Sequence, residues 1–145
     1  MESSYMRKYD HFMSHLSVLL RAPKEDLSNE FIVSGIIDKF FIQFELGWKL
    51  LKEMLAYDGK SISASGSPRS IIKASYECYD FIEEEIWLDM LRDRNDMTHI
   101  YNKSRAMELV NKIIQCYIPA FERMGKAVQE WKKLNEENHW KGKKT

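Results

Sequence analysis

Apolar residues recur every three or four positions along most of the chain, the spacing that places side chains on one face of an α-helix. The first such segment runs from about Tyr5 to Arg21 and should end before Pro23, because the residue preceding a proline disfavours helical dihedrals. The longest runs from about Asn29 to Tyr57, with Ser28 as its expected N-cap. Its apolar positions form two adjacent ridges, so this helix should contact more than one neighbour.

Three residues interrupt the ridges of this longest predicted helix. Gly47 lowers helix propensity, so we expect another part of the chain to approach its backbone closely. Gln43 and Glu45 are polar, and the pattern does not indicate which way they point.

A Gly- and Ser-rich segment, 58–67, follows and is typical of a loop. Its glycines and serines lack the order of a phosphate-binding loop, so we assign it no nucleotide role. Ser67 and Pro68 then have the character of an N-cap and a first helical residue, and they predict a short helix to about Tyr79.

Two further helices are predicted in the second half of the chain. Asp80 and Glu83 have the spacing of a capping box and should open the first of them. The last helix should start after Asn102 and continue to about Leu134, with a kink at Pro119, which lacks a backbone donor.

No segment combines two-residue alternation with strand propensity, and the fold class that follows is all-α. We predict an antiparallel up-and-down bundle of four to five helices. The length suits one domain, which we place at residues 1–135, followed by a polar, disordered tail at 136–145.

Composition narrows the choice of partners and compartment. Lys plus Arg and Asp plus Glu both number 22, so no overall charge draws the chain to nucleic acid or membrane. The first residues lack the apolar core of a signal peptide, and no apolar run reaches the ~20 residues that span a bilayer. These features predict a soluble, cytoplasmic protein.

Cysteine and histidine usage gives no sign of a disulfide or a metal site. Cys78 and Cys116 lie far apart in apolar-periodic segments, and we expect both to be buried free thiols. His11 and His15 are one helical turn apart but have no third ligand nearby, so we expect them at the surface. We therefore predict neither a metal nor another cofactor.

The densest group of polar residues is the stretch 92–102, RDRNDMTHIYN, which lies between segments patterned for burial. On one continuous helix, Arg92, Asn95 and His99 would share a face, whereas Arg94 would lie about 140° from His99. Arg94 and His99 can meet only if the helix ends or bends near Met97, or if a second chain completes the pair. The residues leave open which arginine faces His99.

Arginine and histidine together suit phosphodiester chemistry without a metal. His99 could transfer a proton near neutral pH, and the guanidinium of Arg94 could bind phosphate oxygens. Asn95 or Asp96 could orient either side chain. The alternative, which residue types alone favour, is that Arg94 pairs with an acid such as Asp93 or Asp96 while His99 merely ends a helix.

The segment from Arg94 to Tyr101, RNDMTHIY, resembles the R-N-x-x-x-H-x-Y signature of HEPN-domain proteins. The nearest branch is that of nucleotidyltransferase substrate-binding proteins, which includes the HepT-type toxins. The resemblance spans roughly residues 9–131. It includes FELGWKLLKEML in the longest predicted helix, SPRSIIKAS after the Gly/Ser loop, and WLDMLRDRN ahead of the histidine.

This resemblance implies a helical bundle that forms a homodimer, with the polar motifs of both chains in a shared cleft. It also implies a minimal nucleotidyltransferase as partner, encoded nearby. In toxin members the motif arginine and histidine serve a metal-independent ribonuclease, which the partner silences by adenylylating the motif tyrosine. By resemblance, Arg94 and His99 would be catalytic, Asn95 and Asp96 supporting, and Tyr101 the modified residue.

Three hypotheses follow. The chain is a non-catalytic partner subunit that forms a composite nucleotide or substrate site with a nucleotidyltransferase. Alternatively, it is a ribonuclease toxin of a toxin–antitoxin pair, acting on RNA and silenced through Tyr101. In the third hypothesis it is a plain helical dimerisation module. Whether the chain is itself an enzyme is left open.

Overall fold

The computed structural model describes the backbone of residues 4–143 and the side chains of residues 4–136. All regular structure in this part of the chain is helical. The α-helices are α1 (Ser4–Leu19), α2 (Glu30–Tyr57), α3 (Pro68–Cys78), α4 (Glu84–Asn95), α5 (Lys103–Lys112) and α6 (Ile118–Lys143). A π-helical segment, Ile113–Tyr117, joins α5 to α6 without a break, so the helices of residues 4–143 form five rods, within the predicted four to five.

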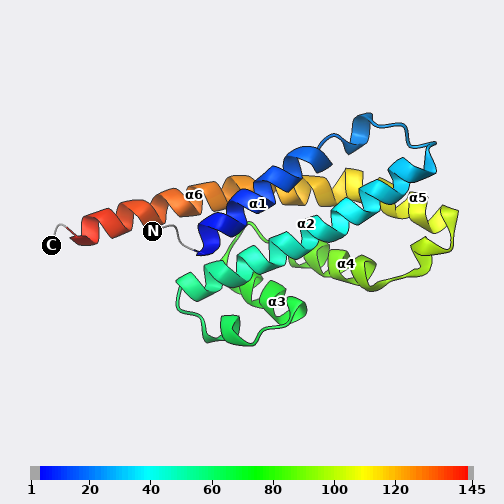
Figure 1. Ribbon diagram of the computed structural model, residues 1–145. Helices are drawn as coiled ribbons and strands as arrows, with labels where there is room; N and C mark the ends of the chain where they lie inside the picture. Colours follow the sequence, from blue (N-terminus) through cyan, green and yellow to red (C-terminus); the bar gives the residue numbers. More distant parts are fainter. Residues whose placement is uncertain (1–3, 144–145) are drawn as a thin grey trace.

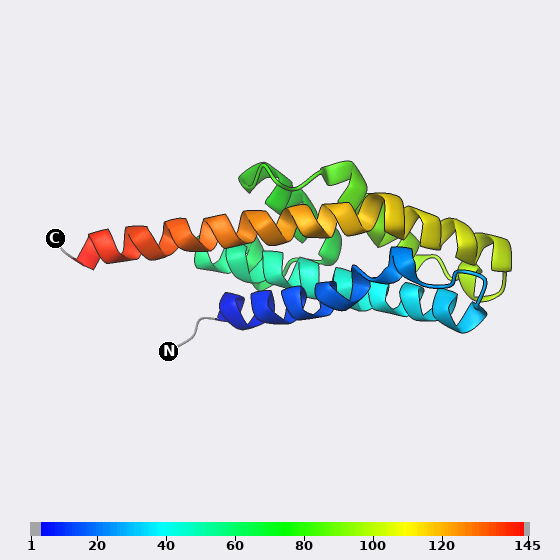
Figure 2. The ribbon, with the colours of Figure 1, turned by 90° about the horizontal axis from the view of Figure 1, so that it is seen from above.

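The long rods run back and forth along the molecule (Figure 1). α1 and α2 are antiparallel, α4 leads back along α2, and the α5–α6 rod returns along the whole length. The short helix α3 begins beside the end of α4 and runs antiparallel to it. Seen from above, α1, α2 and α6 lie side by side (Figure 2). This arrangement confirms the predicted all-α, up-and-down bundle. It also places the start of α2 and the connection from α4 to α5 at the same end of the bundle.

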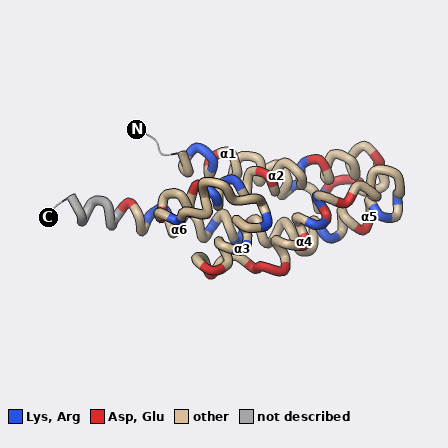
Figure 3. The backbone as a smooth tube through the Cα atoms, turned by 90° about the horizontal axis from the view of Figure 1, so that it is seen from below, with Lys and Arg blue, Asp and Glu red and all other residues tan. Residues whose placement is uncertain are grey.

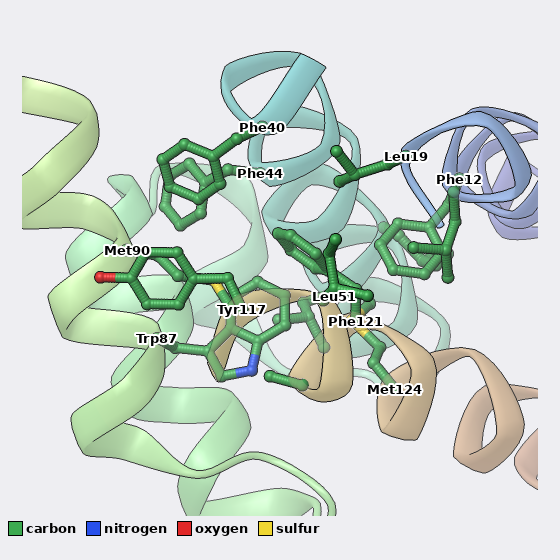
Figure 4. Packing of buried hydrophobic residues seen from close by; sticks show 14 of the residues in the cluster. Phe12, Leu19, Phe40, Phe44, Leu51, Trp87, Met90, Tyr117, Phe121 and Met124 are labelled. Atoms are coloured by element: carbon green, nitrogen blue, oxygen red, sulfur yellow. The ribbon is translucent and has the colours of Figure 1, made fainter. Parts of the chain in front are cut away.

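The core consists of aromatic and aliphatic side chains from several helices (Figure 4). The Trp87 ring from α4 lies 6.1 Å from that of Phe44 and 5.6 Å, edge to face, from that of Phe121. Phe12 from α1 contacts Phe121 as well, at 6.1 Å between ring centroids. Such aromatic pairs contribute about 0.5–1.5 kcal/mol each beyond the burial of their area, so they tie α1, α2, α4 and α6 together.

At Gly47 the Trp87 ring of α4 packs directly against the backbone of α2. A Cβ atom at this position would lie 2.9 Å from Cη2 of Trp87 and 3.3 Å from Cε2 of Phe12. The Trp87 ring is fully buried between other aromatic side chains and has little room to retreat. The close approach predicted at Gly47 is confirmed.

Gln43 is one of two polar residues in the described part of the chain that are fully buried. Its side-chain amide donates to the carbonyl oxygen of Phe12 (3.0 Å), and its Oε1 accepts from Nδ1 of His15 (2.7 Å). His15 is therefore half-buried against α2, whereas His11 is exposed as predicted. The Gln43 amide joins α1 to α2 through polar contacts inside an apolar seam.

Two predicted N-caps are wrong and one is confirmed. Asn29, not Ser28, caps α2 by accepting from the backbone N–H of Phe31 (2.9 Å), because Ser28 instead donates from its backbone and its hydroxyl to Asp26. The expected capping box at Asp80 is absent: Glu83 is the N-cap of α4, and it makes no side-chain capping bond. Ser67 does cap α3, with Pro68 as its first residue.

Three further expectations need correction. Cys78 and Cys116 are free, but both are exposed, because each lies on a part of its helix that faces away from the core. The segment 58–67 contains a short 3-10 helix, Ser61–Ala64. The last helix does not end at about Leu134 as expected, because the backbone of α6 continues to Lys143. Residues 144–145 of the predicted tail lie outside the described part of the chain.

Candidate functional site

The polar stretch folds as the end of α4 and a connection, residues 96–102, that leads to α5. α4 ends at Asn95, and Asp96 is extended. The carboxylate of Asp96 accepts from the backbone N–H (3.0 Å) and the hydroxyl (2.8 Å) of Thr98, and these bonds hold its pKa below the ordinary value. A 3-10 turn, Thr98–Ile100, follows before Asn102 caps α5. The helix thus ends before Met97, which is the condition that the sequence set for any contact between Arg94 and His99 within one chain.

The end of α4, the connection and α5 enclose a polar cavity of about 270 Å³. We call it the polar cavity. Its walls are formed by Arg92, Asp93, Asp96, Thr98, His99, Arg105, Glu108, Leu109 and Lys112. The half-buried His99 ring packs edge-on against Phe41 of α2, with 5.3 Å between centroids. Basic and acidic residues both lie on α4 and α5 (Figure 3), and the cavity carries both signs of charge.

Arg94 is not part of this cavity. Its guanidinium forms an ion pair with Glu45 of α2 and lies 6.0 Å from the centre of the Phe44 ring. The other oxygen of Glu45 accepts from the indole N–H of Trp48 (3.1 Å). Arg94 and Asn95 instead line a separate hollow beside the start of α3. Within one chain, the ending of α4 therefore brings His99 together with Arg92 and Asp96, and not with Arg94.

A partly buried polar network of Tyr117, Asp93 and Lys112 adjoins the polar cavity. The Tyr117 hydroxyl donates to Asp93, and Nζ of Lys112 lies 3.2 Å from Asp93 Oδ2. Burial, together with this hydrogen bond, raises the pKa of the Tyr117 phenol. Arg92 is paired with Asp89 (3.0 Å) one turn back on α4. Lys112 and Arg105 were not among the candidate residues predicted from the sequence, where their only signal was a position in the helix that follows the polar stretch.

On the other side of His99 lies a larger, mainly apolar cavity of about 630 Å³. We call it the apolar cavity. Its walls are formed by Leu27, Ser28, Glu30, Phe31, Val33, Ser34, His99, Ile100, Tyr101, Asn102, Lys103, Ala106 and Met107. Tyr101 is 87% exposed and Phe31 is 81% exposed. Tyr101 was a candidate residue in the sequence but Phe31 was not, because the helical pattern places Phe31 on a solvated face.

Neither metal-ligand clusters nor membrane spans are found where the structure is described. No group of three or more His, Cys, Asp or Glu residues in that region is arranged to hold a metal ion. No described helix is both long enough and apolar enough to cross a bilayer.

Comparison of the sequence with protein families gives one match. A family model described as "Nucleotidyltransferase substrate binding protein like" matches residues 5–130. A comparison with curated proteins finds no match. The matched region contains both cavities and every candidate residue from Arg92 to Tyr101. The chain belongs to the nucleotidyltransferase substrate binding protein-like family.

Proposed function

We propose that the chain is the partner subunit of a minimal nucleotidyltransferase and forms a composite nucleotide or substrate site with it. The observation that carries this proposal is the polar cavity, in which Arg92, Asp96 and His99 converge at one end of the bundle. Membership of the family supports the choice of partner. The nucleotidyltransferase would supply the transfer chemistry, and this chain would hold the acceptor or the nucleotide.

The charges of the polar cavity fit a shared site better than a self-sufficient nucleic-acid groove. Arg92, Arg105 and Lys112 are balanced by the three acids Asp93, Asp96 and Glu108. A lone cavity of this kind attracts a polyanion weakly, because opposite charges within one Debye length cancel at a distance. Donors from a second protein would complete the binding of a phosphate.

A second candidate function, a metal-independent ribonuclease, is favoured by the surroundings of His99 and Tyr101. His99 is half-buried at the cavity wall, and Tyr101 projects into solvent two residues later. In a homodimer, Arg94 of one chain would complete the site around His99 of the other. The partner would silence the enzyme through a bond from the Tyr101 phenolic oxygen to the α-phosphorus of ATP, with loss of the phenol proton and release of pyrophosphate.

Expression with and without the nucleotidyltransferase encoded nearby tests both candidates. The partner-subunit proposal expects the two proteins to co-purify and the purified chain to leave RNA intact. Failure to co-purify would contradict it. Growth arrest without the partner, relieved by His99→Ala, would establish the ribonuclease instead.

The two arginines can be tested separately. For the ribonuclease candidate, we expect Arg94→Ala to impair RNA cleavage or its control by the partner more than Arg92→Ala does, because Arg94 would act across a dimer. Loss confined to Arg92→Ala would show that the cavity seen within one chain is the working site. Sedimentation of wild type and both variants checks the dimer that this reasoning requires.

A further inference from the structure

We propose that the apolar cavity is a base-binding subsite, in which Phe31 stacks on the base of a nucleotide whose phosphate lies in the polar cavity. This inference rests on the proposed function, because it specifies the ligand of that site as a nucleoside phosphate. It adds a residue, Phe31, from a helix that contributes nothing to the polar stretch.

The two cavities are neighbours with a common wall. His99 lines both of them, with the polar cavity toward α5 and α4 and the apolar cavity toward the start of α2. Their volumes are about 270 Å³ and 630 Å³, and sites for small molecules typically measure ~300–1,000 Å³. A ligand with a charged head and a flat, mainly apolar body would fit across His99, and a nucleotide has that form.

The apolar cavity has the side chains that bases require. Phe31 and Tyr101 offer exposed aromatic rings, one from the first turn of α2 and one from the connection. Aromatic stacking is a common means of holding an unpaired base, because every base has a π-face. Ser34 and Asn102 add hydrogen-bonding groups at the cavity wall, where the edge of a base could be read.

The polar cavity has one cation that is available for a phosphate. Arg92 is paired with Asp89, and Lys112 with Asp93. Arg105, at the start of α5, has no carboxylate partner within ion-pair distance in the described part of the chain, and the Asp96 carboxylate, whose pKa it helps to lower, acts on it only from farther away. Its planar guanidinium can donate two parallel hydrogen bonds to phosphate oxygens. We therefore assign the phosphate to Arg105 and His99.

Isothermal titration calorimetry on the full chain, alone and with the nucleotidyltransferase bound, tests the two subsites with three probes. AMP should bind more tightly than adenosine or ribose 5-phosphate, which each fill one subsite. Phe31→Ala should weaken AMP and adenosine about 10-fold and leave ribose 5-phosphate unchanged. Arg105→Ala should weaken AMP and ribose 5-phosphate and leave adenosine unchanged. Tyr76→Ala, which removes another exposed aromatic ring, is the control and should change nothing.

Several outcomes would overturn the inference. One is the absence of AMP binding to the chain and to its complex, and another is AMP affinity that Phe31→Ala does not alter. If Phe31→Ala instead dissociates a dimer without changing AMP affinity, the apolar cavity is a protein interface. Co-purification tests the proposed function by itself. A complex that forms but binds no AMP would contradict only this inference. AMP binding by a chain that forms no complex would contradict only the proposed function.

Discussion

Gly35 and Gly47 lie in the same helix, α2, in opposite surroundings. A Cβ atom at Gly35 would meet nothing within 4 Å, whereas one at Gly47 would press on the buried Trp87 ring. Gly35→Ala should therefore stabilise the protein by up to about 1 kcal/mol through helix propensity. Gly47→Ala gains the same propensity but overpacks the core, which costs about 1–3 kcal/mol, so its net effect should be destabilising. Urea unfolding of both variants measures the difference.

The pair is its own control, because the chemical change is identical at both sites. Equal effects would mean that Trp87 shifts without cost and that the contact at Gly47 does not constrain α2. A loss at Gly47 that Trp87→Phe partly relieves would identify the ring as the obstacle.

The ion pair between Glu45 and Arg94 holds the motif arginine on α2. Both side chains are about one-third exposed, at 29% and 32%, so the pair is partly shielded from water. We expect Glu45→Gln to cost about 1 kcal/mol in unfolding free energy, because Arg94 loses its charged partner. Chemical denaturation at low and high salt should show the loss shrinking as salt screens the charges.

Asp89→Asn is the matched comparison for that substitution. Asp89 pairs with Arg92, whose side chain is 66% exposed, so this pair should contribute less than about 0.5 kcal/mol. Asp89 also lies 3.9 Å from Nζ of Lys112, so a larger loss from Asp89→Asn than from Glu45→Gln would mean that the Asp89 contacts, to Arg92 and Lys112 together, stabilise the fold more than the Glu45 contact to Arg94.

Among the elements, α4 and the π-helical segment are joined by the hydrogen bond from Tyr117 to Asp93. Removing the hydroxyl leaves the Asp93 carboxylate with Lys112 alone. Tyr117→Phe should therefore destabilise the protein by about 2 kcal/mol at neutral pH, the cost of losing a hydrogen bond to a charged group. Thermal unfolding of the two proteins in the same buffer provides the measurement.

The contribution of Tyr117 should depend on pH in one direction. Its pKa is raised in the folded protein, so the folded chain keeps the phenol proton at pH values where the unfolded chain loses it. The stabilisation is complete below about pH 10, the ordinary pKa of tyrosine, and declines as pH rises above it. The difference between wild type and Tyr117→Phe should narrow between about pH 10 and pH 11. A constant difference would contradict the shifted pKa.

Helices were predictable at this scale because the signal for each is local. Ser67 and Pro68 opened α3 as expected, and the last rod started after Asn102. Errors arose where two polar residues competed for one role. Ser28 was a good cap by type, but Asp26 engages it, and Asn29 takes its place. The π-helical segment before Pro119 was not foreseen, because a proline indicates a disturbance without specifying its form.

For the molecule as a whole, the absence of net charge governs how it can meet a nucleic acid. Lys plus Arg equals Asp plus Glu at 22 each, and the cations of the polar cavity are Arg92, Arg105 and Lys112. If the chain binds single-stranded RNA there, log Kd should change with log salt by a slope no steeper than about 2, since three phosphates at most are neutralised. Titrations of an oligonucleotide at several salt concentrations measure this slope. A much steeper slope would require a basic surface elsewhere.

The candidate site was predictable in place but not in composition. Residues 92–102 stood out because polar density amid apolar periodicity is visible along the chain. Which arginine turns to His99 was not visible, because Glu45, the residue that holds Arg94, belongs to a different helix. Phe31 was missed for a similar reason. Its exposed ring lines the same cavity as Tyr101 only in the folded chain, and the sequence does not show this proximity.

The buried amide of Gln43 has a consequence for how α1 and α2 find their alignment. An apolar seam tolerates sliding by one helical turn, since one aliphatic contact can replace another. Sliding would move the buried amide away from the Phe12 carbonyl and His15, and it would leave the amide without hydrogen-bond partners in an apolar interior, which is energetically costly. The cost falls on misaligned states alone, so one polar side chain selects a single axial position for the first two helices. Gln43 therefore serves to fix the alignment of the two helices more than to strengthen their attraction.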